Sequence, residues 1–324
     1  MKHCPYCQHS VQRWGHTESG ASRFFCPSCR RTITRRKRKD VRERHLRHEL
    51  DLWLGGKDNL REISEKRHET RQTFWKHMRP LLSFPFEPAI PRDPVHTLIL
   101  DATYIHGNEL CALVAIDEND RIFWRFAPHE SYTEWYEFLK LFPRPKILVM
   151  DGQKGLFLAA RSLWPLVPIQ RCQFHVIAFC TQYTGRRPKD DASRSVLDLL
   201  YELKYAKTPE SRDQWIRQYK KWESKYDLFL YARGNSGGYR YPKLRSIRYV
   251  IRKALPNLFT FIDHPGTPNT TNLVEGWVNA AVAEAIRRHR GIKDYEKKVL
   301  VSIILTHLVR GGDGKVKKSF YDSL

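Results

Sequence analysis

"HTLILD" at residues 96–101 and "KILVMD" at residues 146–151 decide the fold class of this sequence. Each is a short apolar run that ends in an aspartate, which is typical of a buried strand. We expect Asp101 and Asp151 to stand at the carboxyl ends of their strands, where open α/β sheets place ligand sites. Either aspartate alone would be a turn residue, but the repetition favours a shared site.

The segments around these two runs predict the rest of a sheet. We expect further strands at residues 110–117, 121–127 and 166–172, and helices at residues 131–142 and 154–164. Three strands followed by helix, strand, helix and strand predict a mixed α/β sheet with helices on its faces.

The composition indicates a folded protein that binds a polyanion. The chain has 324 residues, enough for two or three domains, and 57 Lys and Arg against 35 Asp and Glu give a net charge of +22. Nucleic acid is the commonest partner of such a surface, although charge can also serve solubility alone. Without a signal peptide or an apolar run of about eighteen residues, we expect a cytoplasmic, nucleoid-associated protein with no membrane partner.

Four cysteines near the start have the spacing of a zinc site. Cys4 and Cys7 form one Cys-x2-Cys pair, and Cys26 and Cys29 form a second pair 18 residues later. Two such pairs supply the four thiolates of a tetrahedral zinc ion, with no position left open for chemistry. The spacing therefore predicts one structural Zn²⁺ in a zinc ribbon within residues 1–39.

A basic stretch follows the ribbon, and residues with helical periodicity follow that stretch. We expect the stretch to contact DNA phosphates. Its cations are Arg30, Arg31, Arg35, Arg36, Lys37, Arg38 and Lys39. Residues 40–80 predict a helix-turn-helix with Arg71 and Lys76 on its last helix, although a small helical bundle without DNA contact fits too. Residues 81–94 read as a proline-rich linker.

A lone acidic residue stands in "PNTTNLVEGWVNAAV" at residues 268–282. Asn272 and Glu275 fit a capping box at a helix start. Alternatively, Glu275 points into a site and holds a metal, with Asn272 and Asn279 on the same helix face as candidates for orienting it, and Thr271 as the alternative cap.

With these residues in place, the sequence resembles the DDE transposases of bacterial insertion sequences, of the Mutator-type (MULE-like) superfamily with a Cys-x2-His motif. The matching motifs are "LDATYI", "VMDGQKG", "RCQFH" and "TTNLVEGWVN". The resemblance implies an RNase H-like mixed sheet catalytic domain interrupted by an α-helical insertion. Its first part would span residues 95–175, the insertion 176–267 and the C-terminal helices 268–324.

The resemblance also implies the chemistry. Asp101, Asp151 and Glu275 would hold two Mg²⁺ or Mn²⁺ ions, with Asp101 shared between them. Ions would relieve the mutual repulsion of three carboxylates and stabilise both oxygens of an in-line displacement. The reaction would be phosphodiester hydrolysis at terminal inverted repeats, followed by strand transfer to target DNA. Cys172 and His175 would support the site, and their direct metal binding stays open.

Two more basic clusters are candidate DNA contacts. Arg240, Lys243 and Arg245 are interleaved with tyrosines that could stack on bases. Arg287, Arg288 and Arg290 could hold DNA near the metals, or could simply complement a helix dipole. Because two element ends must be recognised, we expect a homodimer. The alternative functions are a catalytically inactive DNA-binding regulator and an RNase H-like host nuclease.

Overall fold

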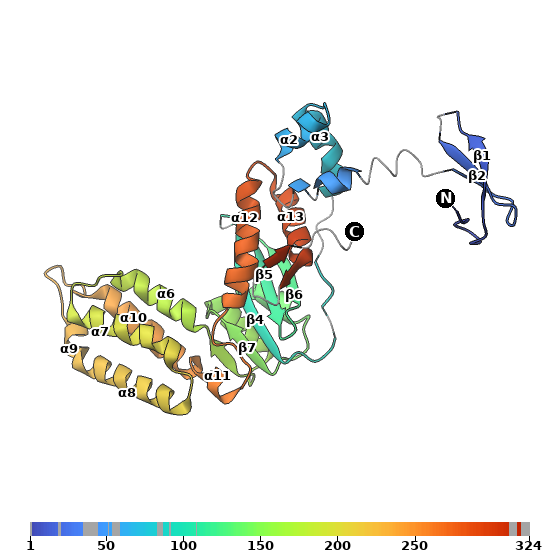
Figure 1. Cartoon of the computed structure of the whole chain (residues 1–324). Coiled ribbons are helices and arrows are strands. Elements are labelled where there is room, and N and C mark those ends of the chain that lie inside the picture. The colour runs from blue at the N-terminus through green and yellow to red at the C-terminus, as the bar shows by residue number, and fades with distance from the viewer. Residues whose placement is uncertain are drawn as a thin grey trace. The chain divides into compact units, whose positions relative to one another are not determined.

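The computed structural model describes residues 2–18, 21–34, 45–50, 52–53, 59–82, 87–90, 92–107, 109–310 and 316–318 (Figure 1). The chain divides into two compact units, and along the sequence the boundary between them falls after residue 83. The basic residues 35–39 lie outside the described part, so their expected DNA contact stays a prediction.

The first unit begins with a small antiparallel sheet. Its strands are β1 (Gln12–His16), β2 (Ser22–Phe25) and β3 (Thr32–Thr34), in that spatial order. Because the sheet is small, its interior consists mainly of the cysteines, with Ile33 and Phe24 packed beside them.

Helices make up the rest of the first unit. Residues 45–50 and 52–53 are helical, and α2 (Leu60–Lys66), α3 (Arg71–Met78) and η1 (Arg79–Leu82) follow. Asn59 and Glu62 form a capping box that starts α2, and Thr70 caps α3. Arg67 ties the helices together through an ion pair of 2.7 Å with Glu49.

The second unit contains a five-stranded mixed sheet in the order β6-β5-β4-β7-β8. Its strands are β4 (Thr97–His106), β5 (Leu110–Asp117), β6 (Ile122–Ala127), β7 (Ile147–Met150) and β8 (Ile169–Arg171). The strands β4, β5 and β6 are antiparallel, whereas β7 and β8 run parallel to β4. The mixed α/β class predicted from the sequence is therefore confirmed.

One predicted boundary is wrong. The strand expected to end at Asp101 continues to His106, because β5 pairs with β4 as far as His106, opposite Leu110. The parallel partner β7 pairs only up to Leu100. Asp101 therefore stands where the parallel ladder ends, inside a longer strand.

Helices cover the sheet on its two faces. The core beneath α4 (Tyr132–Leu139) and α5 (Lys154–Leu163) includes Leu98 and Leu100 of β4. The elements η4 (Val274–Asn279), α12 (Ala280–Arg288) and α13 (Asp294–His307) contact β4 and β6. The C-terminal strands β9 (Leu308–Arg310) and β10 (Val316–Lys318) form a separate hairpin.

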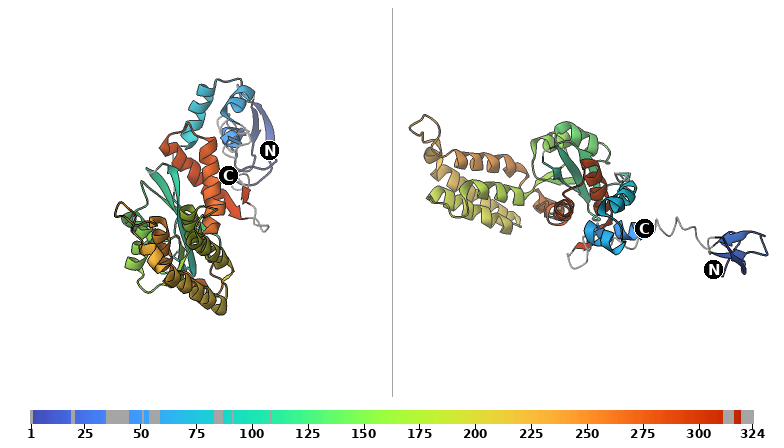
Figure 2. Two further views of the ribbon diagram at one scale, coloured as in Figure 1. Left: turned by 90° about the vertical axis from the view of Figure 1, so that its left-hand side faces the viewer. Right: turned by 90° about the horizontal axis from the view of Figure 1, so that it is seen from above.

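A helical bundle separates β8 from η4 along the chain. Its elements are α6 (Gln173–Thr184), α7 (Asp191–Glu202), η2 (Leu203–Tyr205), α8 (Pro209–Lys225), α9 (Asp227–Tyr231), α10 (Pro242–Ala254), η3 (Leu255–Asn257) and α11 (Thr260–Asp263). In Figure 1 and in the right-hand view of Figure 2 it lies beside the sheet rather than on either face.

The aromatic stripe of α8 forms the centre of this bundle. Trp215, Tyr219 and Trp222 are buried, and both indole N–H groups donate to carbonyl groups of α7. The stripe therefore packs in the core of the bundle. No helix among the described residues is long and apolar enough to cross a membrane.

Candidate active site

Asp101 and Asp151 come from neighbouring parallel strands. Leu100 and Met150 are the last residues paired between β4 and β7, so the two aspartates follow at adjacent positions. Successive side chains of a strand point to opposite faces. Leu100 enters the core under α4 and α5. Asp101 is therefore directed to the face covered by η4.

The carboxyl group of Asp101 is buried and only half satisfied. Its side chain is 8% exposed, Oδ1 accepts a hydrogen bond of 2.9 Å from the N–H of Ala102, and Oδ2 has no hydrogen-bond partner in the described part of the chain. Burial and the negative charge of Asp151 raise the pKa of Asp101 to about 7, although His175 partly opposes them. An orphaned buried carboxylate oxygen is a position that a cation would fill.

A tight turn holds Asp151. Its Oδ1 accepts a hydrogen bond of 2.8 Å from the N–H of Gln153, and Gly152 between them has a φ of +87°. The guanidinium group of Arg171 packs against Gly152, where a Cβ atom would lie 2.0 Å from Arg171 Nη1. Burial lowers the pKa of Arg171, and the charge of Asp151 opposes this. Only glycine fits this turn.

Glu275 lies on a π-helical turn, η4. Such turns widen the helix and are frequent at functional sites. The hydroxyl of the fully buried Thr271 donates to Glu275 Oε1 over 3.0 Å, and the backbone N–H of Thr271 donates to Cys172 Sγ over 3.2 Å.

The predicted capping box of Asn272 and Glu275 is wrong, because the helix already begins at Asn272 and the N–H of Asn272 bonds to Thr270. Thr271 stands just before the helix, as the alternative expected, but its hydroxyl contacts the Glu275 carboxylate. Asn272 is exposed, and no hydrogen bond joins its side chain to Glu275 among the described residues. Asn279 accepts a hydrogen bond from Thr103 of β4 and so ties η4 to the sheet.

His175 links the start of α6 to Glu275. Its Nδ1 lies 3.3 Å from Glu275 Oε1. Burial lowers the pKa of His175, but the hydrogen bond with Cys172 and the negative charges of Cys172, Glu275 and Asp101 outweigh it and raise the pKa to about 9. His175 is therefore a cation among carboxylates at neutral pH.

One set of candidate ligand atoms lies close together at this site. Those of Cys172, His175 and Glu275 all lie within 4.8 Å of one another. Asp101, Asp151 and Glu275 do not form such a group among the described residues, although Asp151 and Glu275 both raise the pKa of Asp101. The fold thus brings the three predicted carboxylates into electrostatic contact, with Glu275 turned toward His175.

Sequence reasoning missed Glu130. It precedes α4 and accepts a hydrogen bond of 3.1 Å from the indole N–H of Trp135. Burial and the charge of Asp151 raise the pKa of Glu130. No local motif marks this residue, because its proximity to Asp151 arises only when α4 packs on the sheet. Arg171 and Thr271, by contrast, lie inside the motifs "RCQFH" and "TTNLVEGWVN".

The four cysteines of the first unit form a second candidate metal centre. The sulfur atoms are 3.6 Å apart in Cys4 and Cys29 and 3.4 Å apart in Cys7 and Cys26. Thiolates 2.3 Å from a tetrahedral zinc ion would be about 3.8 Å apart, so the set fits zinc with little adjustment.

The two cysteine pairs have the same backbone conformation. The N–H of the first cysteine of each pair bonds to a carbonyl five residues later, from Cys4 to His9 and from Cys26 to Arg31. The residue after each pair, Gln8 or Arg30, has a positive φ. This repeated turn directs both pairs of thiols toward one point, although burial opposes ionisation. Backbone and thiol hydrogen bonds nevertheless lower the pKa of Cys4 to about 6.

The other predicted DNA contacts lie on several elements. Arg71 and Lys76 are exposed on α3, and Arg290 is exposed beyond α12. Arg287 and Arg288 form ion pairs of 2.7 and 2.6 Å with Glu284, which offsets part of their charge.

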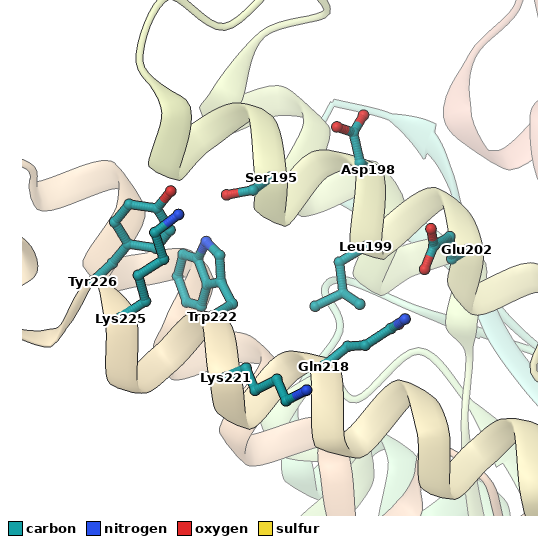
Figure 3. A pocket seen from close by; sticks show the side chains of 9 residues that line it. All are labelled: Ser195, Asp198, Leu199, Glu202, Gln218, Lys221, Trp222, Lys225 and Tyr226. Atoms are coloured by element: carbon teal, nitrogen blue, oxygen red, sulfur yellow. The ribbon is translucent and has the colours of Figure 1, made fainter.

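A groove of about 310 Å³ lies between α7 and α8 (Figure 3). Asp198 and Glu202 line one side, and Lys221 and Lys225 line the other. Its lining includes none of the predicted catalytic residues, and its mixed charge favours neither a metal nor a polyanion.

The family was established by comparison with known proteins. A model of the family described as "Transposase, Mutator family" matches residues 54–232. The match contains Asp101, Asp151, Cys172 and His175 and ends before Glu275. No match to a curated protein was found. Because the matched segment covers more than half of the sequence, this chain belongs to the Mutator family of transposases.

Proposed function

We propose that this chain is an insertion-sequence transposase that cleaves and joins DNA with an RNase H-like catalytic domain. The observation that carries the proposal is Asp101, whose buried and unpaired Oδ2 stands beside Asp151 at the end of the only parallel ladder of β4 in the described sheet. The Mutator family match supports the same activity class.

The donors at this site suit magnesium. Asp101, Asp151 and Glu275 offer carboxylate oxygens, the ligands that Mg²⁺ and Mn²⁺ prefer. Asp101 would be shared by two ions, with Asp151 and Glu275 each completing one. When bound, such ions stabilise the attacking and leaving oxygens of a phosphodiester displacement.

The chain's own residues would prepare the site. Thr271 and His175 fix the carboxylate of Glu275, and Arg171 holds the Gly152 turn that presents Asp151. The cationic His175 offsets negative charge that would otherwise keep Asp101 protonated near neutral pH. Water that loses a proton to solvent would attack the scissile phosphorus, and the P–O3′ bond would break to release a 3′-hydroxyl that takes up a proton. That 3′-hydroxyl, losing its proton to solvent, would later attack a target phosphorus and displace the target 3′-oxygen, which takes up a proton.

The first unit would supply DNA binding. The four-cysteine cluster would hold one structural Zn²⁺, and α2 and α3 would form a helix-turn-helix that presents Arg71 and Lys76 to a duplex. The bundle from α6 to α11 would be the insertion of the catalytic domain. Pairing of two element ends would require a homodimer.

Strand nicking of duplex DNA that carries the element's terminal repeat tests the proposal. With Mg²⁺, the protein should nick one strand at the element boundary, and Asp101→Asn should abolish nicking while DNA binding persists. Asp120→Asn, on the turn between β5 and β6, removes a carboxylate outside the site and should leave nicking unchanged. Nicking by Asp101→Asn at the wild-type rate would refute the metal site. Binding without nicking by the wild type would favour a regulator.

A further inference from the structure

Two basic loops meet at one end of the helical bundle. One joins α6 to α7 (residues 185–190), and the other joins α9 to α10 (residues 232–241). The adjoining residues Tyr183, Asp190 and Lys243 line one cavity of about 350 Å³, so the loops are neighbours. Figure 1 shows them at the end of the bundle that is farthest from the sheet. We call the two loops, together with the first turn of α10, the basic tip.

The basic tip carries cations that carboxylates do not neutralise. Residues 232–245 contain four Lys and Arg and no Asp or Glu. Among the described residues, no ion pair joins a carboxylate to any cation of the tip. These cations are Arg186, Arg187, Lys189, Arg233, Arg240, Lys243 and Arg245. The two nearby acids are engaged elsewhere, because Asp190 caps α7 and Asp191 pairs with Arg194.

Tyrosine rings fix two of the arginines in place. The guanidinium groups of Arg245 and Arg233 lie 3.5 and 3.9 Å from the ring centroid of Tyr239. Arg233 also donates a hydrogen bond of 3.3 Å to the Tyr239 hydroxyl. Such contacts order the long side chains in advance, which reduces the entropy that binding must overcome.

The same contacts change the role expected for the tyrosines. The ring of Tyr239 is occupied by arginines, and Tyr241 stacks on Phe229 with centroids 3.8 Å apart. Each ring therefore has at least one face already covered. The geometry therefore favours contact with phosphates, which carry no sequence information, over the base stacking that the sequence suggested.

The helix α6 connects the tip to the candidate active site. His175 lies in its first turn, and the first basic loop begins at its end. The ten residues from His175 to Gly185, at 1.5 Å each, separate the two by about 15 Å. With bases spaced 3.4 Å apart along a strand, this distance corresponds to roughly four base pairs of duplex DNA.

We propose that the basic tip binds the sugar–phosphate backbone of duplex DNA, without sequence preference, about four base pairs from the scissile phosphate. The proposal deepens the proposed function and rests on it for the identity of the polyanion. The tip adds a second contact on the same duplex, so it raises affinity without contributing to end recognition.

Salt-dependent DNA binding tests this proposal on the full-length protein. The tip variant combines Arg187→Gln, Arg240→Gln and Lys243→Gln and retains the arginines that pack on Tyr239. The probe is a fluorescent DNA duplex of about 30 base pairs with an unrelated sequence. Each lost phosphate contact should make the negative slope of log K against log salt less steep by about 0.9. For the three substitutions together, we expect the slope to become less steep by about 2 to 3. The affinity at low salt should fall at least about tenfold.

Matched variants make the outcome decisive. Arg217→Gln, Lys220→Gln and Lys221→Gln together remove three exposed cations from α8 and should leave the slope within about one contact of wild type. Replacing Arg187 and Arg240 by lysine should preserve affinity. Equal slopes for the tip and α8 variants, or a loss confined to terminal-repeat DNA, would overturn the proposal. The tip variant retains every catalytic residue, so its DNA affinity tests the tip alone. Nicking by Asp101→Asn would instead refute the catalytic proposal.

Discussion

The substitution Thr271→Val tests how Glu275 is held. Valine keeps the shape of the buried threonine but removes the hydroxyl that lies 3.0 Å from Glu275 Oε1. The backbone N–H of Thr271 still donates to Cys172, and His175 still contacts Glu275. The change therefore removes one of the two contacts on the carboxylate, together with the longer contacts of the hydroxyl with Cys172 Sγ (3.3 Å) and His175 Nδ1 (3.4 Å).

The structure sets the size of the effect. A hydrogen bond to a charged group contributes roughly 1.5–3 kcal/mol, which corresponds to about a 10- to 150-fold change in rate if it is needed in the transition state. Since His175 retains Glu275 in part, we expect the lower end, a loss of about 10- to 30-fold in the nicking rate. Single-turnover nicking across a Mg²⁺ titration measures it, and half-maximal activity should shift to higher Mg²⁺.

The neighbouring Thr270→Val serves as the control. Its hydroxyl accepts only a weak contact of 3.4 Å from Asn272 and does not touch Glu275. If Thr271→Val nicks DNA at the wild-type rate, or if Thr270→Val loses as much activity, Thr271 does not position Glu275. DNA affinity should not change in either variant, which separates positioning from binding.

Three further predictions concern the turn, a buried histidine and the cysteines. Gly152→Ala should lower the free energy of unfolding by about 1–2 kcal/mol more than Gly266→Ala in guanidinium denaturation, because both strain a positive φ but only the former displaces Arg171. Burial, assisted by Arg288, lowers the pKa of His289 to about 4. The stability that the neutral His289 contributes to the folded state is therefore fully present above pH 6.5 and is lost as pH falls. Between pH 7 and 5, wild type should therefore lose about 2 kcal/mol relative to His289→Asn. Cys26→Ser should reduce bound zinc from about one equivalent to none, measured by atomic absorption.

Clear results would contradict each of these. Equal destabilisation by the two glycine variants would mean that Arg171 yields freely. Parallel pH profiles of wild type and His289→Asn would show that the histidine titrates normally. Taking the difference between the two proteins also cancels Asp101, whose raised pKa acts in the opposite direction over the same pH range. A full zinc equivalent in Cys26→Ser would exclude the four-cysteine centre.

The sequence predicted the sheet because the physics of its strands is local. Buried parallel strands must be nearly continuous apolar runs, so "LILD" and "LVMD" predicted both strands and the aspartates at the end of their parallel pairing. Cysteine spacing is local too, because each Cys-x2-Cys pair spans only four residues. Helical periodicity is local as well, and it places Trp215, Tyr219 and Trp222 on one face of α8.

Contacts between distant segments could not be predicted in this way. The continuation of β4 beyond Asp101 depends on pairing with β5, and the proximity of Glu130 to Asp151 depends on the packing of α4. The π-helical turn at Glu275 and the bond from Thr271 to that carboxylate bring residues 172, 175 and 275 together across about a hundred positions of chain.

The sequence by itself determined which residues carry charge, thiols and apolar faces, because these are properties of each side chain and its near neighbours. Only the tertiary structure decided that Tyr239 holds arginines, that Glu275 is turned toward His175, and that Asp101 retains an unpaired buried oxygen. Hydrogen-bond satisfaction and desolvation depend on what surrounds a group in space, and a linear sequence does not specify those surroundings.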